Sequence, residues 1–242
     1  MTSARTALVW GLIAKEALGS PVSVAHVCAA AVAAVEVDGA SLTIMVSPTV
    51  RDAVHVTDRV AAELEEWQFT FGQGPCVDAF ATGGPVLVAD LHTPAQAARW
   101  PAFTPAAAGS GARAVFALPL QVGAIRLGVM ALYRTRPGAL DRDEVADALA
   151  FADVAGALLL DRSAGTVAPE DAWQQEDPTA HQAQVHQATG MILAQLGVSA
   201  AAAFARLRAH AYAHDLRLGD VARDVVERRL RFEPEPVAGD GE

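Results

Sequence analysis

A polar, acidic stretch interrupted by two prolines, residues 163–178 (SAGTVAPEDAWQQEDP), divides this chain into two parts of different character. Every segment that we predict to be a strand precedes this stretch, and only helical patterns follow it. Such exposed, proline-containing segments are typical of domain boundaries. We therefore predict two domains, at residues 1–162 and 179–232, joined by a linker at 163–178 and followed by a disordered tail at 233–242.

The N-terminal part combines helical and strand patterns. Helices are predicted at 2–18 and 22–35, separated by Ser20-Pro21, and at 58–67 and 141–160, where Asp58 and Asp141 are the capping residues. Strands are predicted at 40–46, 53–56, 85–89, 113–122 and 125–133, the last two forming a hairpin around Gly123-Ala124. Between these elements we expect one or two helical turns at 76–81 and a loop with a short helix at 94–110. This order predicts an α+β fold, an antiparallel sheet with helices on one face.

The C-terminal part has only helical periodicity. The first predicted helix runs to Leu196 and stops at Gly197, and Ser199 can cap the second. Apolar stripes predict the buried faces of the second helix (Phe204, Leu207, Ala211) and of the third (Leu218, Val221, Ala222, Val225, Val226). We therefore expect a small all-α domain of three helices.

Charge is distributed unevenly between the two parts. The whole chain carries a net charge of −10, yet residues 179–231 hold seven arginines against four acidic residues, or +3, so the remainder carries −13. Such asymmetry is a hint of a nucleic-acid-binding part. No stretch reaches 18 apolar residues, so we expect no membrane span. Cys28 and Cys76 are the only cysteines, which favours a reducing, cytoplasmic location.

No residue pattern in the sequence predicts catalysis. Lys15 is the only lysine, which excludes a GxxxxGK phosphate loop and a Schiff-base lysine, and neither GxSxG nor HExxH occurs. His26, His55 and His92 lack a metal-binding spacing such as HxxxH. We therefore expect a non-enzymatic protein with no metal site and no resident cofactor.

The C-terminal helices carry a spaced pattern of residues. It comprises Gln187-Ala188-Thr189-Gly190-Met191, then Ala203-Phe204, Leu207-Arg208 and Ala211, and finally Leu218, Asp220-Val221-Ala222 and Val225-Val226. This pattern resembles the ANTAR domain, the RNA-binding output module of transcription antitermination regulators. The resemblance implies binding to RNA with two short hairpins that have six-nucleotide loops, action against an overlapping terminator, and dimerisation. Thr189 departs from the family, which usually has a basic residue there.

The resemblance and the solvated helix faces together suggest which residues contact RNA. Our candidates are Ala188, Gly190, Met191, Arg208, His210, Arg217 and Arg223. Arginine can both contact phosphates and stack on splayed loop bases. The alternative is that the arginines form ordinary helical ion pairs with Asp220, Asp224 and Glu227. Gly190 also has two interpretations, close packing of the three helices or close approach of RNA, because a mid-helix glycine costs about 1 kcal/mol relative to alanine.

The N-terminal part carries motifs of its own. They are Phe71–Ala79 (FGQGPCVDA), Gly84–Leu91 (GPVLVADL), Trp100-Pro101, and Ala117–Leu120 followed by Leu127–Val129. Over about residues 20–162 they resemble a GAF domain, a sensory module often placed before ANTAR. GAF domains often hold a small molecule, and a pocket here would be lined by Phe71, Cys76, Phe80, Phe116 and Met130. The alternative is a filled apolar core, in which Cys76 is a small buried residue rather than a redox or attachment thiol.

Together these patterns predict a two-domain signalling protein. A GAF-like sensor of unknown cue would control an ANTAR-like output that binds hairpin-containing RNA, and the protein would act as a homodimer. Two alternatives remain: a protein-interaction module whose helical part docks on another regulator, and, less favoured, a small-molecule enzyme built on the sensor fold.

Overall fold

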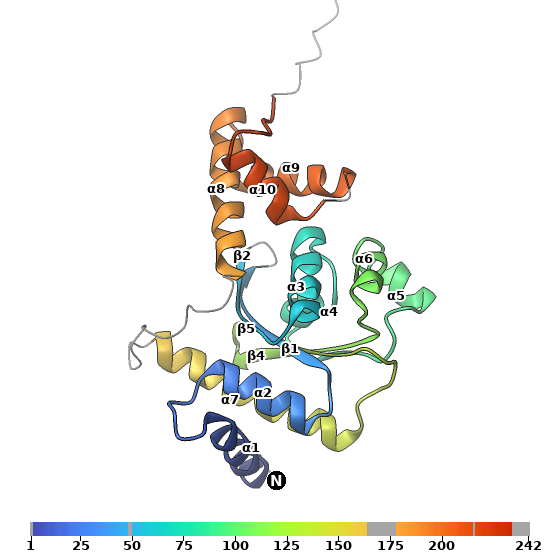
Figure 1. The fold of residues 1–242 in the computed structure, drawn as a ribbon, viewed down its shortest axis with the longest axis vertical. Helices are drawn as coiled ribbons and strands as arrows, with labels where there is room; N and C mark the ends of the chain where they lie inside the picture. Colours follow the sequence, from blue (N-terminus) through green and yellow to red (C-terminus); the bar gives the residue numbers. More distant parts are fainter. Residues whose placement is uncertain (1, 48–49, 164–177, 215, 234–242) are drawn as a thin grey trace, which may run out of the picture. The chain divides into compact units, whose positions relative to one another are not determined.

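The computed structural model describes residues 2–47, 50–163, 178–214 and 216–233 (Figure 1). The chain separates into two compact units, Met1–Pro178 and Thr179–Glu242, which are described one at a time. The predicted linker at 163–178 lies outside the described residues apart from its two ends. The predicted tail at 233–242 lies outside them apart from Glu233.

The first unit is built on a five-stranded antiparallel sheet with the strand order β2-β1-β5-β4-β3. The strands are β1 (Gly39–Ser47), β2 (Val50–Val56), β3 (Val86–Val88), β4 (Ala114–Val122) and β5 (Ile125–Arg134). Every predicted strand is present, and β2 begins three residues earlier than predicted. Val122 pairs with Ile125, which confirms the hairpin around Gly123-Ala124.

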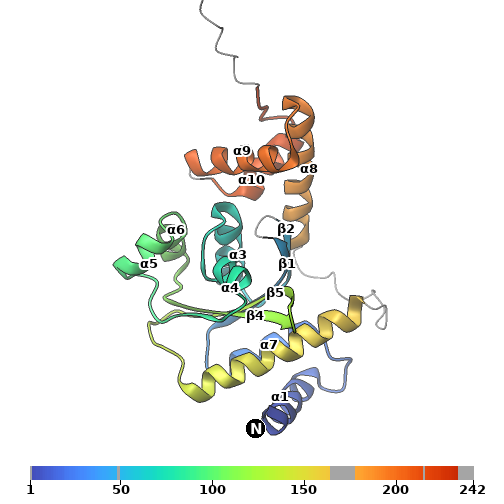
Figure 2. The ribbon, with the colours of Figure 1, turned by 180° about the vertical axis from the view of Figure 1, so that it is seen from behind.

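Helices cover both faces of this sheet (Figures 1 and 2). One face packs against α2 (Val24–Ala34) and α7 (Arg142–Ser163), on which α1 (Thr2–Ala17) lies as an outer helix. The other face packs against α3 (Arg59–Phe71) and α4 (Pro75–Thr82), with α6 (Phe103–Ser110) beside α3 and α5 (Pro94–Arg99) beside α6. The expectation of helices on one face was therefore wrong. The sequence of β4, AVFALPL, is apolar at successive positions because residues 114–120 are buried on both sides of the sheet.

The region 94–110 contains two helices rather than one. Thr93 caps α5 through its side-chain oxygen, which accepts from the Gln96 amide, and Pro94 occupies the first helical turn. The predicted caps of the longer helices are confirmed: Asp58 accepts from Val60 and Ala61 at the start of α3.

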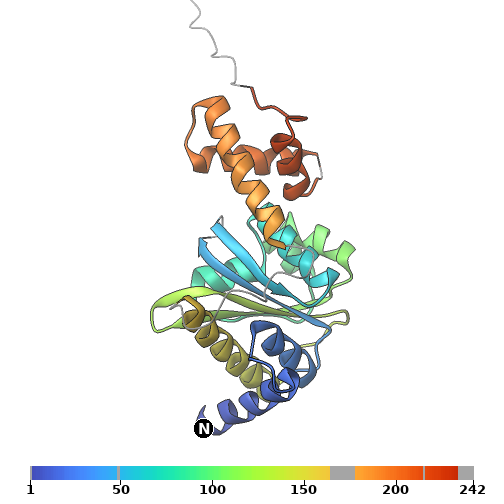
Figure 3. The ribbon, with the colours of Figure 1, turned by 60° about the vertical axis from the view of Figure 1, so that its left-hand side comes forward.

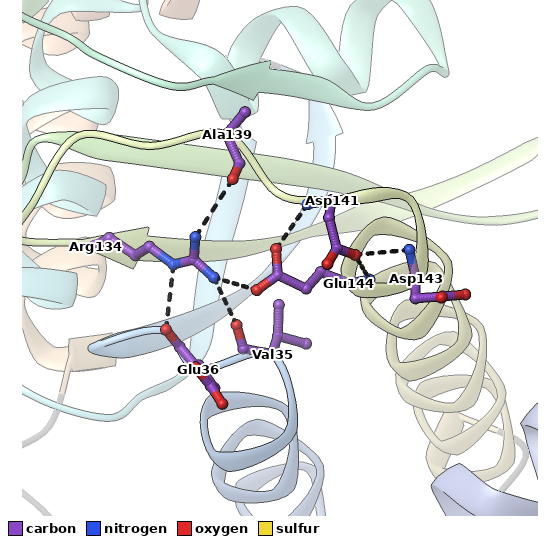
Figure 4. A network of polar contacts seen from close by, with 7 residues as sticks. All are labelled: Val35, Glu36, Arg134, Ala139, Asp141, Asp143 and Glu144. Atoms are coloured by element: carbon purple, nitrogen blue, oxygen red, sulfur yellow. Dashed lines mark hydrogen bonds and ion pairs between the residues drawn. The ribbon is translucent and has the colours of Figure 1, made fainter.

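Arg134, at the end of β5, joins three elements on the α2 and α7 side of the sheet (Figure 4). Its guanidinium donates to the carbonyls of Val35 and Glu36 at the end of α2, at 2.9 and 3.2 Å, and forms an ion pair with Glu144 of α7 at 2.7 Å. The second Glu144 oxygen accepts from the Asp141 amide, while Asp141 caps the first turn of α7. One cation thus satisfies the open carbonyls of α2 and fixes the start of α7.

The second unit consists of α8 (Pro178–Leu196), α9 (Ala200–Ala213) and α10 (Leu218–Val226), shown in orange and red in Figure 3. Gly197, with φ +64°, follows α8, and Ser199 caps α9 by accepting from the Ala202 amide, as predicted. The predicted stripes form its interior, where the buried side chains are Val185, Ala188, Ile192, Ala203, Phe204, Leu207, Ala211, Leu218, Val221, Ala222 and Val225.

Among the described helices, none is by itself long and apolar enough to cross a membrane. Within the described part of the chain, one pair of helices, Ala183–Leu196 and Ala200–Ala213, is together long and apolar enough, but the pair is bent by 108°. Both helices bury apolar side chains within the second unit, and core helices of soluble proteins pass the same test, so this is weak evidence for a span.

Candidate functional site

The motif FGQGPC, residues 71–76, forms the joint between α3 and α4. Gly72 adopts the left-handed conformation, φ +61°, and its amide closes α3 on the Gln68 carbonyl. Gly74, with φ +131°, begins α4 without a capping side chain, and a Cβ there would overlap the Gln68 side chain. Gln68 Oε1 instead accepts from the Cys76 amide at 2.7 Å. Both glycines are therefore required by the backbone, and Gln68 supplies the missing cap.

Cys76 belongs to a chain of buried hydrogen bonds between the sheet and α3. Gln68 Nε2 donates to its Sγ at 3.2 Å, the thiol donates to Glu65 Oε1 at 3.8 Å, and Ser41 Oγ donates to the same carboxylate oxygen at 2.7 Å. Burial and the neighbouring Glu65 carboxylate raise the pKa of the Cys76 thiol well above its usual value. The thiolate that redox chemistry and ligand attachment require is therefore disfavoured.

Two further polar side chains from the first two strands, Arg51 and Thr43, are also buried. Arg51 is 4% exposed, donates to the Glu65 carbonyl at 2.8 Å and lies 5.0 Å from the Phe69 ring centroid. Desolvation lowers its pKa. The Thr43 hydroxyl is fully buried and has no hydrogen-bond partner among the described residues. The α3 side of the sheet thus carries a polar cluster inside an otherwise apolar core.

The end of the first GAF-like motif contacts the Trp100-Pro101 motif. Asp78 Oδ2 accepts from the Trp100 indole at 3.2 Å and pairs with Arg99 at 2.8 Å, and Arg99 lies over the Trp100 ring. Gln73 Oε1 accepts from the Ala102 amide at 3.0 Å. Motifs that are 20 to 30 residues apart in the sequence therefore hold α4, α5 and α6 together as one layer.

The five residues predicted to line a pocket do not share a cavity. Cys76 and Phe80 are buried on the α3 side of the sheet, where Phe71 packs at the margin, stacked on Trp67. Phe116 and Met130 are fully buried on the opposite side, against α2 and α7. The prediction failed because successive side chains of a strand point to opposite faces of the sheet, and the sequence does not say which helices cover each face.

A small cavity does lie between the sheet and α3. Its volume is about 10 Å³, which corresponds to about one water molecule. It is lined by Ser41, Ala61, Leu64, Gln68, Val115, Ala131, Leu132 and Tyr133, none of which is among the predicted five. A cavity of this size would have to enlarge before it could hold an organic ligand.

In the second unit, the QATGM motif contributes to both the core and the surface of α8. Ala188 is fully buried, so its methyl group cannot contact RNA, and the prediction that it does is wrong. Thr189 Oγ1 donates to the Val185 carbonyl one turn back, at 2.7 Å, and Met191 is half-buried. Gly190 is exposed, and a Cβ built on it would meet nothing within 4 Å. Packing among the three helices therefore does not explain this glycine.

The polar RNA candidates lie on the other two helices. Arg208 is half-buried on α9, with its guanidinium 5.7 Å from the Phe204 ring centroid. Arg217 is exposed at the start of α10. Arg223, half-buried near the end of α10, pairs with Asp220 at 3.2 Å, an ion pair that the alternative interpretation expected. The candidates other than Ala188 thus include exposed or half-exposed groups from all three helices.

One feature of α9 was missed in the sequence. His210 and His214, four residues apart, stack with ring centroids 4.1 Å apart, and His214 Nδ1 lies 2.8 Å from the His210 carbonyl oxygen. Burial and the nearby His214 lower the pKa of His210, which favours its neutral ring. The i, i+4 spacing was the available signal. The structure shows no cluster of three or more metal-ligating side chains in the part of the chain that it describes.

These features define a layered α+β sensor-type domain joined to a three-helix output unit. A family model described as GAF domain matches residues 22–160, and one described as ANTAR domain matches residues 176–226. The chain therefore belongs to the GAF domain family and carries an ANTAR domain, a combination typical of regulators. A search among curated proteins finds no match.

Several solved structures are similar to the chain. The GAF domain of a phosphoenolpyruvate-protein phosphotransferase from Coxiella burnetii has 16% identity and a TM-score of 0.49, covering 68% of this chain and 98% of that one. The corresponding domain from Acinetobacter has 10% identity and a TM-score of 0.46, covering 69% and 100%. A type II free methionine-R-sulfoxide reductase from Thermoplasma acidophilum has 13% identity and a TM-score of 0.38, covering 51% and 79%.

Proposed function

We propose that this protein is an RNA-binding transcription antitermination regulator. Its ANTAR domain binds leader RNA that contains two hairpins with six-nucleotide loops, and this binding prevents formation of an overlapping terminator. The observation that carries the proposal is the surface of the ANTAR unit. Its motif leaves Gly190 open to solvent and leaves arginines on α9 and α10 at least partly exposed.

The exposed groups suit the chemistry of RNA loops. Unpaired loop bases splay outward, where arginine can hydrogen-bond to them and stack on them, while phosphates add an attraction that salt screens. Arg208 and Arg217 are the leading contacts, and His210, Arg223 and Met191 are further half-exposed candidates on the same small unit. The ion pair between Arg223 and Asp220 is compatible with this role, because exposed pairs contribute little and can exchange for phosphate.

Gly190 supports the same interpretation. The space where its side chain would lie is empty in the three-helix unit, so the missing methyl group benefits a molecule that approaches α8 from outside. A nucleic-acid backbone or an edge-on base can approach a bare helix surface more closely than one that carries a Cβ.

The GAF domain would control this output. A homodimer in which a cue changes the placement of the two ANTAR domains would shift the population between RNA-competent and RNA-incompetent arrangements. Because the cavity beside α3 holds only about 10 Å³, a small-molecule effector would have to enlarge it on binding.

A gel-shift titration of the full chain with a two-hairpin RNA tests the proposed function. We expect affinity to fall steeply with salt, and the Arg208→Ala/Arg217→Ala double variant to lose at least tenfold in affinity and to show a shallower salt slope. Arg142→Ala, which removes an exposed charge on α7, serves as the control and should bind normally. Absence of RNA binding by the unmodified protein would instead favour docking of the helical unit on another regulator.

A further inference from the structure

The chain continues in an ordered form beyond the ANTAR match, which ends at residue 226. Residues 227–233, the post-helix segment, turn back directly after α10. The Arg228 amide donates to the Val225 carbonyl at 3.0 Å and the Arg229 amide to the Asp224 carbonyl at 2.7 Å. These two hydrogen bonds define a Schellman closure, a fixed end to the helix.

Arg228 occupies the position in this closure where glycine is usual. Its φ is +61°, a left-handed conformation that disfavours residues with a Cβ. Its side chain is exposed and takes part in no hydrogen bond or ion pair within the described part of the chain. The left-handed backbone favours glycine here, and the arginine instead places an exposed cation at the C-terminal end of α10, where a partner can reach it.

The far end of the segment docks on the stacked histidines. The Phe232 amide donates to Gln195 Oε1 of α8 at 3.1 Å, and the Phe232 ring meets His210 edge-on, with centroids 5.5 Å apart. His210 in turn stacks on His214. Three rings from α9 and the post-helix segment therefore form a ladder whose last member, His214, is exposed.

The three arginines of the post-helix segment have different surroundings. Arg229 is held by two carboxylates, Asp224 at 2.6 Å and Glu227. Arg228 and Arg231 are exposed and, among the described residues, have no carboxylate partner. Exposed guanidinium groups and an exposed flat ring within one short segment and its docking helix suit single-stranded RNA, because the cations can contact phosphates and the ring can stack on a base.

We propose that the post-helix segment and the histidine ladder form an additional RNA-contact surface, in which Arg228 and Arg231 contact phosphates and His214 stacks on an unpaired loop base. This inference rests on the proposed function, and it extends the RNA footprint past the end of the matched ANTAR residues.

Arg228→Gly in the full chain separates folding from binding. Glycine fits the left-handed position better than arginine, so thermal unfolding of the ANTAR unit should occur at an equal or higher temperature. Affinity for a two-hairpin RNA should fall about threefold to tenfold at moderate salt, and the slope of log affinity against log salt should become shallower by about 0.7 to 0.9. Arg231→Gln should lower the affinity and the salt slope by similar amounts. The charge-matched control Arg142→Gln should change neither the affinity nor the salt slope.

His214→Ala tests the stacking contact. Loss of one stacked base should weaken binding about tenfold, with an unchanged salt slope. RNAs with single abasic substitutions in the loops should include one whose missing base weakens the unmodified protein but makes no further difference to His214→Ala. That non-additivity is the signature of a direct contact.

The possible failures are distinguishable. If the unmodified protein binds the RNA and all three variants bind within twofold of it, the post-helix segment has no role and the inference is wrong, while the proposed function stands. If the unmodified protein does not bind two-hairpin RNA at all, the proposed function fails and this inference fails with it.

Discussion

The GAF motif and the ANTAR motif are used in opposite ways. In the GAF domain, Gln68 and Cys76 hydrogen-bond to each other in the interior, and the absence of a Cβ on Gly74 leaves room for Gln68 at the joint between α3 and α4. In the ANTAR unit, Ala188 fills the core, but Gly190 two residues later faces open space. A family motif therefore does not by itself mark a binding site. The GAF motif mainly builds the fold, whereas the ANTAR motif contributes both to the core and to an exposed surface.

The two faces of the GAF sheet repeat this contrast on a smaller scale. The face toward α2 and α7 packs apolar side chains, and its principal polar element, Arg134, lies at the edge of the layer. The face toward α3 buries Ser41, Glu65 and Gln68 as a connected network. Buried polar networks specify one arrangement strongly, and we expect the α3 face to be the more sensitive to changes in hydrogen bonding.

Arg134→Met should have the largest effect on stability. It removes the cation that serves two α2 carbonyls and leaves Glu144 without its partner, so the free energy of unfolding should fall by about 3 kcal/mol. The matched control is Arg113→Met, which breaks the more exposed pair with Asp90 and should cost about 1 kcal/mol or less. Urea unfolding of both variants measures the difference, and equal losses would mean that Arg134 does not tie α2 to α7.

Gln68→Leu should destabilise the GAF domain by about 2 kcal/mol. The substitution strands the buried Cys76 amide and removes the cap of α4 without changing the size of the side chain greatly. Gln121→Leu, at an exposed position of β4, is the control and should change stability little. Urea unfolding with a fluorescence readout from Trp67 and Trp100 checks this prediction, which an unchanged midpoint for Gln68→Leu would refute.

Stability should fall at alkaline pH because of the buried thiols. Burial raises the pKa of Cys28 to about 12, so an unfolded chain, whose thiol ionises near pH 9, releases protons that the folded chain keeps. This stabilisation is complete below pH 9 and is lost as pH rises toward 12, by about 1.4 kcal/mol for Cys28 between pH 8 and 10. Cys28→Ala should show a smaller loss over that range in denaturation measured at both pH values. A pH dependence identical to that of the unmodified protein would contradict the assignment.

Gly190→Ala should have the smallest effect on stability, and of opposite sign. An alanine fits without contact at an exposed helix position, so the ANTAR unit should gain about 1 kcal/mol. Gly74→Ala, in the GAF domain, should instead destabilise, because its φ of +131° and the Gln68 side chain both oppose a Cβ. If Gly190→Ala is more stable and binds two-hairpin RNA as well as before, the glycine is not part of the RNA surface.

The sequence was sufficient for most of the architecture. Alternation and turn residues located the strands, and Asp58, Ser199 and Gly197 marked helix ends that the structure confirms. Only one of the two helices in 94–110 was predicted, although Pro105 lies in the first turn of α6, where proline is tolerated. The sequence did not predict that helices cover both faces of the sheet, because a strand that is buried on both faces does not alternate between apolar and polar residues.

The candidate site was less predictable for physical reasons. Placing Phe116 and Met130 beside Cys76 required knowing which side of each strand faces α4, and that depends on the whole sheet. The stacked pair of His210 and His214 follows from helical spacing, but its extension by Phe232 depends on a chain reversal after α10. Long-range contacts of this kind leave no periodic signal in a sequence.

Selection of bound RNAs from a random-loop library by the purified full chain tests the central claim most directly. We expect enrichment of RNAs with two hairpins and six-nucleotide loops, and loss of that enrichment in the Arg208→Ala/Arg217→Ala variant. Recovery of the unselected library, or an enrichment that the double variant retains in full, would contradict the assignment of the ANTAR surface as the RNA-binding site.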